Sequence, residues 1–260
     1  MRVASTGLTP VKGTRHQGLD AVDLRGEGPV GDRLFALVDP GRRQVLRTVG
    51  HASLLQVAVT WDEPVLSATV AGEVASGVPE RTGETLDVDY WGRRVRVDVV
   101  GGPWAALFSR HLGQAVVLAR ARPGDVVYGD QVSVVTTASL TALRGTDRET
   151  SDARSLDLAD SARFRSTFVL DTTGSPHDRP GAEDDWVGRE LTLGEARVRL
   201  SAPVVRCAVV ELHPVDGHRD LRLLDALPRD SQGRPVFGLQ GQVVRPGRVH
   251  RGSEARISDG

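Results

Sequence analysis

The chain has 260 residues, of which 39% are hydrophobic and 26% charged; its 33 basic and 34 acidic side chains give a formal net charge of −1. This describes a globular protein of one large domain or two closely packed ones, and it excludes a disordered or fibrous chain. The charge balance gives no overall attraction to nucleic acid, and no apolar run approaches the ~20 residues that span a bilayer. We therefore expect no nucleic-acid partner and no membrane span. Because the N-terminus carries no apolar leader segment, we expect a cytoplasmic location.

The first hundred residues predict short strands separated by turns. The expected strands lie at residues 34–38, 54–61, 86–90 and 94–99. The last two alternate between apolar and polar side chains and are joined by Tyr90-Trp91-Gly92, which predicts a hairpin. Regular short strands with glycine and proline between them are typical of a barrel or a sandwich.

The pattern changes after residue 100. Gly101-Gly102-Pro103 precedes a predicted helix over residues 104–112, which Gly113 ends. Further strands are expected at 131–136, 167–171, 191–193, 196–200, 204–212 and within 242–257, and further helices at 138–144, 159–164 and 218–227. The sequence thus predicts a mainly β fold with short helices (α+β), divided into residues 1–100 and 101–260.

Cysteine and lysine each occur once in the chain, as Cys207 and Lys12. A single cysteine excludes an internal disulfide, as is typical of a reducing compartment, and leaves one candidate for thiol chemistry. Since almost every basic residue is arginine, Lys12 is a candidate for a site that needs a compact ammonium group; chance survival is the alternative.

Cys207 follows Arg206 in an apolar run that predicts a core strand. On spacing alone, the favoured role is an inert, buried small side chain. The functional alternative depends on the neighbouring arginine, which stabilises a thiolate able to attack electrophiles or bind a soft metal.

Three other groups of residues have both a structural and a functional interpretation. Arg163-Phe164-Arg165 is either a solvated arginine pair around a core phenylalanine or an anion clamp. The Asp32-Arg33 pair is either structural or directs Arg33 into a site. His213 and His218 are separated by Pro214 and Gly217 in an expected loop, which is a poor frame for zinc, so no metal cluster is predicted there.

Together these segments resemble the MOSC domain proteins, a family named after the C-terminal domain of molybdenum cofactor sulfurase. The N-terminal half is similar to the β-barrel domain that precedes MOSC in the mitochondrial amidoxime-reducing component and its bacterial relatives. The matching motifs are Thr9-Pro10-Val11-Lys12-Gly13, Gly31-Asp32-Arg33, Leu46-Arg47-Thr48, Thr136-Thr137-Ala138-Ser139, Arg163-Phe164-Arg165, Glu183-Asp184-Asp185-Trp186 and Arg206-Cys207. The resemblance implies a β-barrel MOSC domain at 101–260 packed with a β-barrel-like MOSC-associated domain at 1–100.

The resemblance also implies the residues of a site. Cys207 would be the catalytic residue and ligate the molybdenum of the molybdenum cofactor (Mo-molybdopterin), since a thiolate suits that metal. The expected cofactor-binding residues are Lys12, Arg33, Arg47, Thr136, Ser139, Arg163, Arg165, Thr167 and Arg206. The chain departs from the family where Ser166-Thr167 replace Pro-Asn and where Leu239 replaces an aromatic residue.

The activity that the resemblance implies is the reduction of a small N-hydroxylated or N-oxide substrate by a molybdenum-cofactor-dependent oxidoreductase. No ferredoxin-like or pyridoxal-phosphate-dependent segment is recognisable, so the electrons are expected from a separate ferredoxin-type or flavin/cytochrome-type protein. Two alternatives stay open: a sulfur transferase that carries a persulfide on Cys207, and a non-catalytic carrier of the cofactor.

Overall fold

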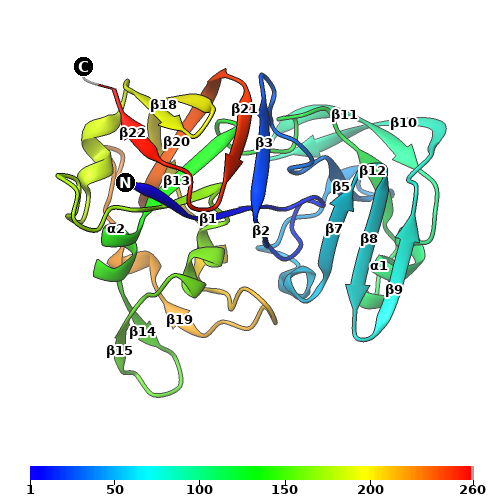
Figure 1. Cartoon of the computed structure of the whole chain (residues 1–260). Helices are drawn as coiled ribbons and strands as arrows, with labels where there is room; N and C mark the ends of the chain where they lie inside the picture. The colour runs from blue at the N-terminus through cyan, green and yellow to red at the C-terminus, as the bar shows by residue number, and fades with distance from the viewer. Residues whose placement is uncertain (259–260) are drawn as a thin grey trace.

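A computed structural model describes residues 1–258 of the chain, so residues 259 and 260, at the end of the predicted second domain, lie outside the described part. The structure consists mainly of strands with a few short helices, which confirms the predicted fold class. Figure 1 shows an eight-stranded sheet with its α2 helix on one side of the molecule and a closed barrel on the other. Among the described residues, no helix has both the length and the apolar character needed to cross a membrane.

The eight-stranded sheet is formed largely by the second half of the chain. Its strands in spatial order are β2 (Gln17–Leu19), β1 (Arg2–Leu8), β16 (Phe168–Asp171), β13 (Val132–Thr136), β20 (Val236–Arg245), β18 (Ala196–Val205), β17 (Glu190–Leu193) and β22 (Ala255–Ile257). Alternate residues of β17 and β18 face a core that includes Trp186, Leu191, Leu193, Val198 and Leu200. The alternation that predicted this hairpin therefore arises from one buried face.

The closed barrel contains three of the four strands expected in the first half of the chain, those at 34–38, 86–90 and 94–99. Its order is β10 (Arg81–Tyr90), β11 (Arg93–Val100), β12 (Val117–Arg120), β5 (Phe35–Asp39) and β6 (Gln44–Val45). β10 and β11 form the predicted hairpin, in which Tyr90 pairs with Arg93 across the two-residue turn Trp91-Gly92. Both turn residues have positive φ, 55° and 78°, as a tight hairpin turn of this hand requires.

Three small sheets and several single turns complete the chain. The sheets are β7 (Ala58–Asp62), β8 (Val65–Val70) and β9 (Glu73–Gly77); β21 (Gly247–His250), β3 (Ala21–Arg25) and β4 (Gly28–Pro29); and β15 (Ala153–Ser155), β14 (Arg144–Asp147) and β19 (Leu221–Arg222). The 3-10 helices are η1 (Ala52–Gln56), η2 (Ala159–Phe164), η3 (Ala182–Trp186), η4 (Ala208–Glu211) and η5 (Leu224–Ala226).

Helix α1 (Trp104–Leu112) confirms the helix that was predicted after Pro103. Trp104, Leu107 and Phe108 are buried against the core of the barrel half. Gly113 adopts the left-handed conformation with φ 65°, and its N–H donates to the carbonyl of Arg110, so the glycine ends the helix as expected.

Strand pairing crosses the predicted boundary between residues 100 and 101 in both directions. β1 pairs with β16, so the first strand of the chain is part of the eight-stranded sheet. β12 pairs with β5 and β11, so a strand from the second half closes the barrel. The two halves therefore exchange strands, and the division into two domains stays a prediction.

Four predicted elements are corrected by the structure. The run 54–61 begins in η1 and is extended only in β7, and the helix expected over 138–144 is α2 (Thr137–Ala142), which gives way to strand β14. The strand expected over 204–212 ends at Val205. The helix expected over 218–227 is instead a short strand and a 3-10 turn, because β19 pairs with β14 and the Glu211 carboxylate accepts the N–H groups of Leu223 and Leu224.

Candidate functional site

A cavity of about 310 Å³ opens between the barrel half and the eight-stranded half, and Cys207 is on its wall. We call it the Cys207 cavity. Its wall is unusual for the number of cations that it gathers from both halves of the chain. The basic residues on the wall are Lys12, Arg33, Arg47, Arg163, Arg165 and Arg206; the aromatic ones are Tyr90, Trp91, Tyr128 and Phe164.

Cys207 is an exposed residue at the start of a 3-10 turn. It is extended, with φ −125° and ψ 176°, and its carbonyl accepts the N–H of Val210 at 3.1 Å. Strand β18 has ended two residues earlier. The favoured interpretation on spacing alone, an inert cysteine buried in a core strand, is therefore wrong, and the thiol is accessible for chemistry.

Arg206 and Arg165 are held by backbone carbonyls. The Arg206 guanidinium donates to the carbonyls of Phe237 at 2.7 and 2.9 Å and of Phe164 at 2.7 Å. Arg165 donates to the carbonyls of Gly13 at 2.8 Å and Thr14 at 2.6 Å. Burial, together with the charge of Arg33, lowers the pKa of Arg206 to about 9 and that of Arg165 to about 10. Both groups remain cationic at neutral pH.

Lys12 is placed on the wall by its backbone, since its N–H donates to the carbonyl of Phe35 at 2.7 Å. Its Nζ atom lies 5.3 Å from the centre of the Tyr90 ring. Burial lowers the pKa of Lys12 from 10.5 to about 7, and the neighbouring charges of Arg33 and Arg165 add to this shift. The ammonium group is therefore partly deprotonated near neutral pH, and an anion in the cavity would restore its charge.

Arg33 and Arg47 complete the cationic part of the wall. Arg33 forms an ion pair with Asp32, whose other oxygen accepts the N–H of Thr9 at 2.8 Å. The backbone of Arg33 is left-handed, with φ 46°, a costly conformation for a long side chain. The Arg47 guanidinium lies 4.3 Å from the centre of the Trp91 ring.

Most of these charges have no counter-ion. Within residues 1–258, Lys12, Arg47, Arg165 and Arg206 form no ion pair with a carboxylate. Asp130 also lines the cavity, but its carboxylate already accepts hydrogen bonds from Ser201 and Gln242. Because a buried cation without a counter-charge is costly, the electrostatics of this wall are complementary to an anion.

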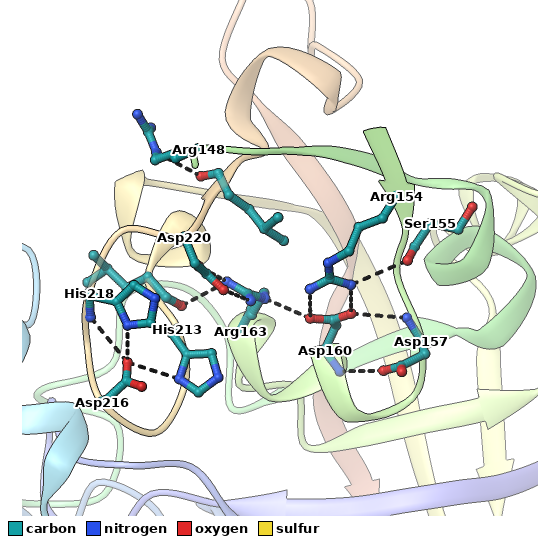
Figure 2. Close-up of polar contacts among 12 residues, drawn as sticks. Arg148, Arg154, Ser155, Asp157, Asp160, Arg163, His213, Asp216, His218 and Asp220 are labelled. Carbon is teal, nitrogen blue, oxygen red and sulfur yellow. Dashed lines mark hydrogen bonds and ion pairs between the residues drawn. The ribbon is translucent and has the colours of Figure 1, made fainter. Parts of the chain in front are cut away.

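Arg163 reaches the wall, but its guanidinium is bound by acceptors of the protein itself. It is buried between two carboxylates, donating to Asp160 Oδ1 at 2.9 Å and to both oxygens of Asp220, one of them at 2.8 Å (Figure 2). A further bond joins it to the carbonyl of Leu212 at 3.1 Å. Four of its five N–H groups are therefore used within the protein, and the expectation that Arg163 binds a cofactor stays a prediction.

The hydroxyl groups predicted to bind the cofactor also point elsewhere. Thr136 and Ser139 both donate to the buried carboxylate of Glu183, at 3.0 and 2.7 Å. Thr136 also caps α2 by accepting the N–H of Ser139 at 3.2 Å, which removes that N–H as an anion donor. Thr167 accepts the N–H of Ser133 at 3.1 Å and lies behind this wall residue.

Aromatic residues at the cavity are the part of the wall that the motif analysis missed. Trp91 and Tyr128 are exposed by 44% and 59%, and their ring centres are 5.9 Å apart. Burial raises the pKa of Tyr90 to about 12, so its hydroxyl stays neutral. The hairpin signal located Trp91 in a turn but gave no indication of what the turn faces.

The charge state of Lys12 leads to a testable pH dependence. We expect sulfate, whose charge is constant from about pH 6 to 9, to bind the cofactor-free protein more tightly at about pH 6 than at about pH 8.5. The reason is that Lys12, with a pKa of about 7, is charged below this pH and neutral above it. One lost charge-assisted hydrogen bond corresponds to roughly a tenfold weaker affinity.

The measurement is the sulfate-dependent shift in Tm, compared with chloride at equal ionic strength. Lys12→Met is the matched control and should bind sulfate weakly at both pH values. An equal pH dependence in wild type and Lys12→Met would contradict the role given to the ammonium group.

Comparisons with known proteins give a family for the second half of the chain. Residues 102–256 match the model of the MOSC domain. The molybdenum cofactor sulfurase of Anopheles gambiae is 32% identical over 94 residues, which are 36% of this chain and 11% of that protein, so the chain spans only a small part of this relative.

Two solved structures are similar to the chain at low sequence identity. The YUAD protein from Bacillus subtilis is 11% identical with a TM-score of 0.41, over 98% of this chain and 94% of that one. A protein of Bordetella bronchiseptica, known from a solution structure, is 16% identical with a TM-score of 0.30, over 36% of this chain and 75% of that one.

Proposed function

The chain belongs to the MOSC domain family, and from this premise we propose that it is an oxidoreductase that binds the molybdenum cofactor in the Cys207 cavity. Its proposed substrates are small N-hydroxylated or N-oxide compounds. The observation that carries the proposal is one exposed thiol on a wall with four cations, Lys12, Arg47, Arg165 and Arg206, that lack a carboxylate partner within residues 1–258.

The residues of the cavity fit this cofactor. Its phosphate is an anion, and guanidinium and ammonium groups are the donors that bind phosphate best. Its metal is bound by sulfur, and an exposed thiolate is a suitable soft ligand. The acidic residue of the wall, Asp130, is already bonded to Ser201 and Gln242 and does not oppose a bound anion.

In this mechanism the bound molybdenum centre supplies the two-electron removal of an oxygen atom from the substrate. The chain contributes the binding and the orientation. Cys207 would hold the metal through its Sγ atom, and Arg165 and Arg206, fixed by backbone carbonyls, would hold the anionic part of the cofactor. Lys12, on the same wall, would hold a proton at Nζ below about pH 7.

The test is the molybdenum content of the protein from a host that makes the cofactor, together with its turnover. We expect about one molybdenum per chain by elemental mass spectrometry, and consumption of an N-hydroxylated amidine when a reduced viologen supplies electrons. Protein without molybdenum would overturn the proposal. Metal-loaded protein without turnover would replace the proposed reductase function with that of a cofactor carrier.

Sulfur transfer is the second candidate, favoured by the exposure of Cys207 beside Arg206. A persulfide on Cys207 would be an anion next to a cation. This function predicts cyanide-labile sulfur on Cys207 in protein that contains no molybdenum. The protein prepared for the molybdenum measurement can be assayed for this sulfur.

The exposed aromatic rings of Trp91 and Tyr128 on the cavity wall predict a preference for aromatic substrates. Trp91→Ala should raise KM for an aromatic N-hydroxylated amidine by roughly fivefold, since one stacking contact contributes about 1 kcal/mol, and should leave kcat nearly unchanged. The KM of a small aliphatic N-oxide should hardly change, and this is the control. Equal increases for both substrates would show that Trp91 acts through Arg47, on which it stacks, and not through the substrate.

A further inference from the structure

A second group of metal-binding side chains lies outside the Cys207 cavity, on a chain reversal between Leu212 and Arg219. These two residues form an antiparallel bridge, and the N–H of His213 donates to the carbonyl of His218 at 2.8 Å. Gly217 turns the chain with φ 81°, in a place where a Cβ atom would be 2.3 Å from the carbonyl oxygen of Ala52. The reversal therefore brings His213 and His218 together, contrary to the expectation from their spacing.

Three side chains converge on this reversal. Nδ1 of His213 and Nδ1 of His218 lie 3.0 and 2.5 Å from the same oxygen of Asp216. The two imidazole rings are stacked, with centres 5.3 Å apart and 19° between their planes. One ligand atom from each of the three residues can be chosen so that all lie within 4.8 Å of one another. Figure 2 shows dashed contacts from both rings to the Asp216 carboxylate.

The hydrogen bonding of this group is incomplete. Nδ1 of His213 is buried and, within residues 1–258, has no hydrogen bond of acceptable angle, although it is 3.0 Å from the Asp216 oxygen. In the same part of the chain, Asp216 pairs with the two histidines and with no arginine or lysine. A buried, unbonded imidazole nitrogen and an unneutralised carboxylate facing the same point are complementary to a cation.

We propose that His213, Asp216 and His218 bind a zinc ion. Two imidazole nitrogens and one carboxylate oxygen form a donor set typical of zinc sites that keep a fourth position for water. The proposal is independent of the Cys207 cavity, because none of the three residues lines it.

The bound ion would fasten the reversal to both halves of the molecule. Arg15 donates to the carbonyl of Val215 at 3.1 Å and Gln56 to that of Asp216 at 2.9 Å, so the reversal already contacts the N-terminal half. On its other side, Leu212 and Asp220 hold Arg163. A ligand that binds only the folded reversal stabilises the fold by mass action.

The test uses the full chain with Cys207→Ser as background, so that the thiol cannot bind the metal, and without the molybdenum cofactor. After chelation, the protein is titrated with zinc by calorimetry and with cobalt by visible absorption. We expect one ion per chain and a rise in Tm of about 5 °C at a roughly hundredfold excess over Kd. Asp216→Asn and His218→Ala should each raise Kd at least about tenfold.

His250→Ala, which removes an exposed histidine elsewhere, is the control and should bind zinc like the background protein. The metal-free Tm of each variant is measured in parallel; His218 and Asp216 are about half exposed, so their replacement leaves the metal-free fold intact. No zinc binding, or binding that survives in both Asp216→Asn and His218→Ala, would overturn the proposal.

Discussion

Cys207→Ser is expected to leave a folded protein that binds the molybdenum cofactor roughly a hundredfold more weakly, so that the purified protein has lost most of its molybdenum and its reductase activity in proportion. Even the outer-shell partners of metal ligands change affinity by roughly 10- to 100-fold when they are replaced, and the proposed role of Cys207 is that of a ligand. Serine keeps the size of the side chain but replaces a soft sulfur donor with a poorly matched hydroxyl. Because Cys207 is exposed and contributes little to the packed core, the Tm of the metal-free protein should not change.

The measurement is elemental mass spectrometry on wild type and variant prepared from the same host, with Tm as the check on folding. Val209→Ala is the matched control, since Val209 lines the same cavity and offers no donor atom. Unchanged molybdenum in Cys207→Ser would contradict the ligand role. Activity lost with molybdenum retained would show that the thiol acts on the substrate and does not hold the metal.

The sequence predicted the cationic wall because motif positions and geometry agree there. Lys12, Arg33, Arg47, Arg165 and Arg206 come from segments far apart in the chain, and all of them line the Cys207 cavity. The local sequence pattern could not show that these residues converge. Their convergence requires the pairing of β1 with β16 and the closure of the barrel by β12. The resemblance to a family supplied that long-range information.

Short sequence motifs predicted the structure correctly where a single turn determines it. The β10–β11 hairpin and the end of α1 depend on residues with positive φ. Gly92 and Gly113 mark these two places in the sequence, because glycine adopts positive φ readily. The helix expected over 218–227 failed because its leucines have helical spacing while its backbone is engaged by β14 and Glu211. Those partners lie outside the segment, so periodicity could not reveal them.

Arg163 is the residue for which motif and structure differ most. The motif placed it with Arg165 around a ligand, whereas its guanidinium connects η2 to the segment after η4 through Asp160, Asp220 and the carbonyl of Leu212. Adjacent residues in a sharp turn can point in opposite directions, and Arg165 has φ 49°. The bonds of the Arg163 guanidinium therefore support the segments that carry Arg165 and Cys207, although Arg163 also lines the cavity.

Arg163→Ala is accordingly expected to lower the free energy of unfolding by about 3–5 kcal/mol, because it leaves the partly buried Asp220 carboxylate without its arginine and removes one of the two arginines that bind Asp160. Arg163→Lys should recover part of the lost free energy of unfolding, since an ammonium group can neutralise one carboxylate but cannot form paired bonds to both. Arg154→Ala is the matched control. Arg154 also binds Asp160 but is 43% exposed, so its loss should cost no more than about 1 kcal/mol.

Denaturant titrations at several pH values separate this structural role from a role in ligand binding. Although burial alone would raise it, hydrogen bonds from Arg154 and Arg163 lower the pKa of Asp160 from 3.8 to about 2. The stability from this carboxylate is therefore present above about pH 4 and is lost as the pH falls toward about 2. Arg163→Ala should reduce this acid dependence as well as the stability at neutral pH. If the variant instead unfolds like wild type and loses only molybdenum, Arg163 acts at the cofactor as the motif implied, because a residue that holds η2 in place cannot be removed without a change in stability.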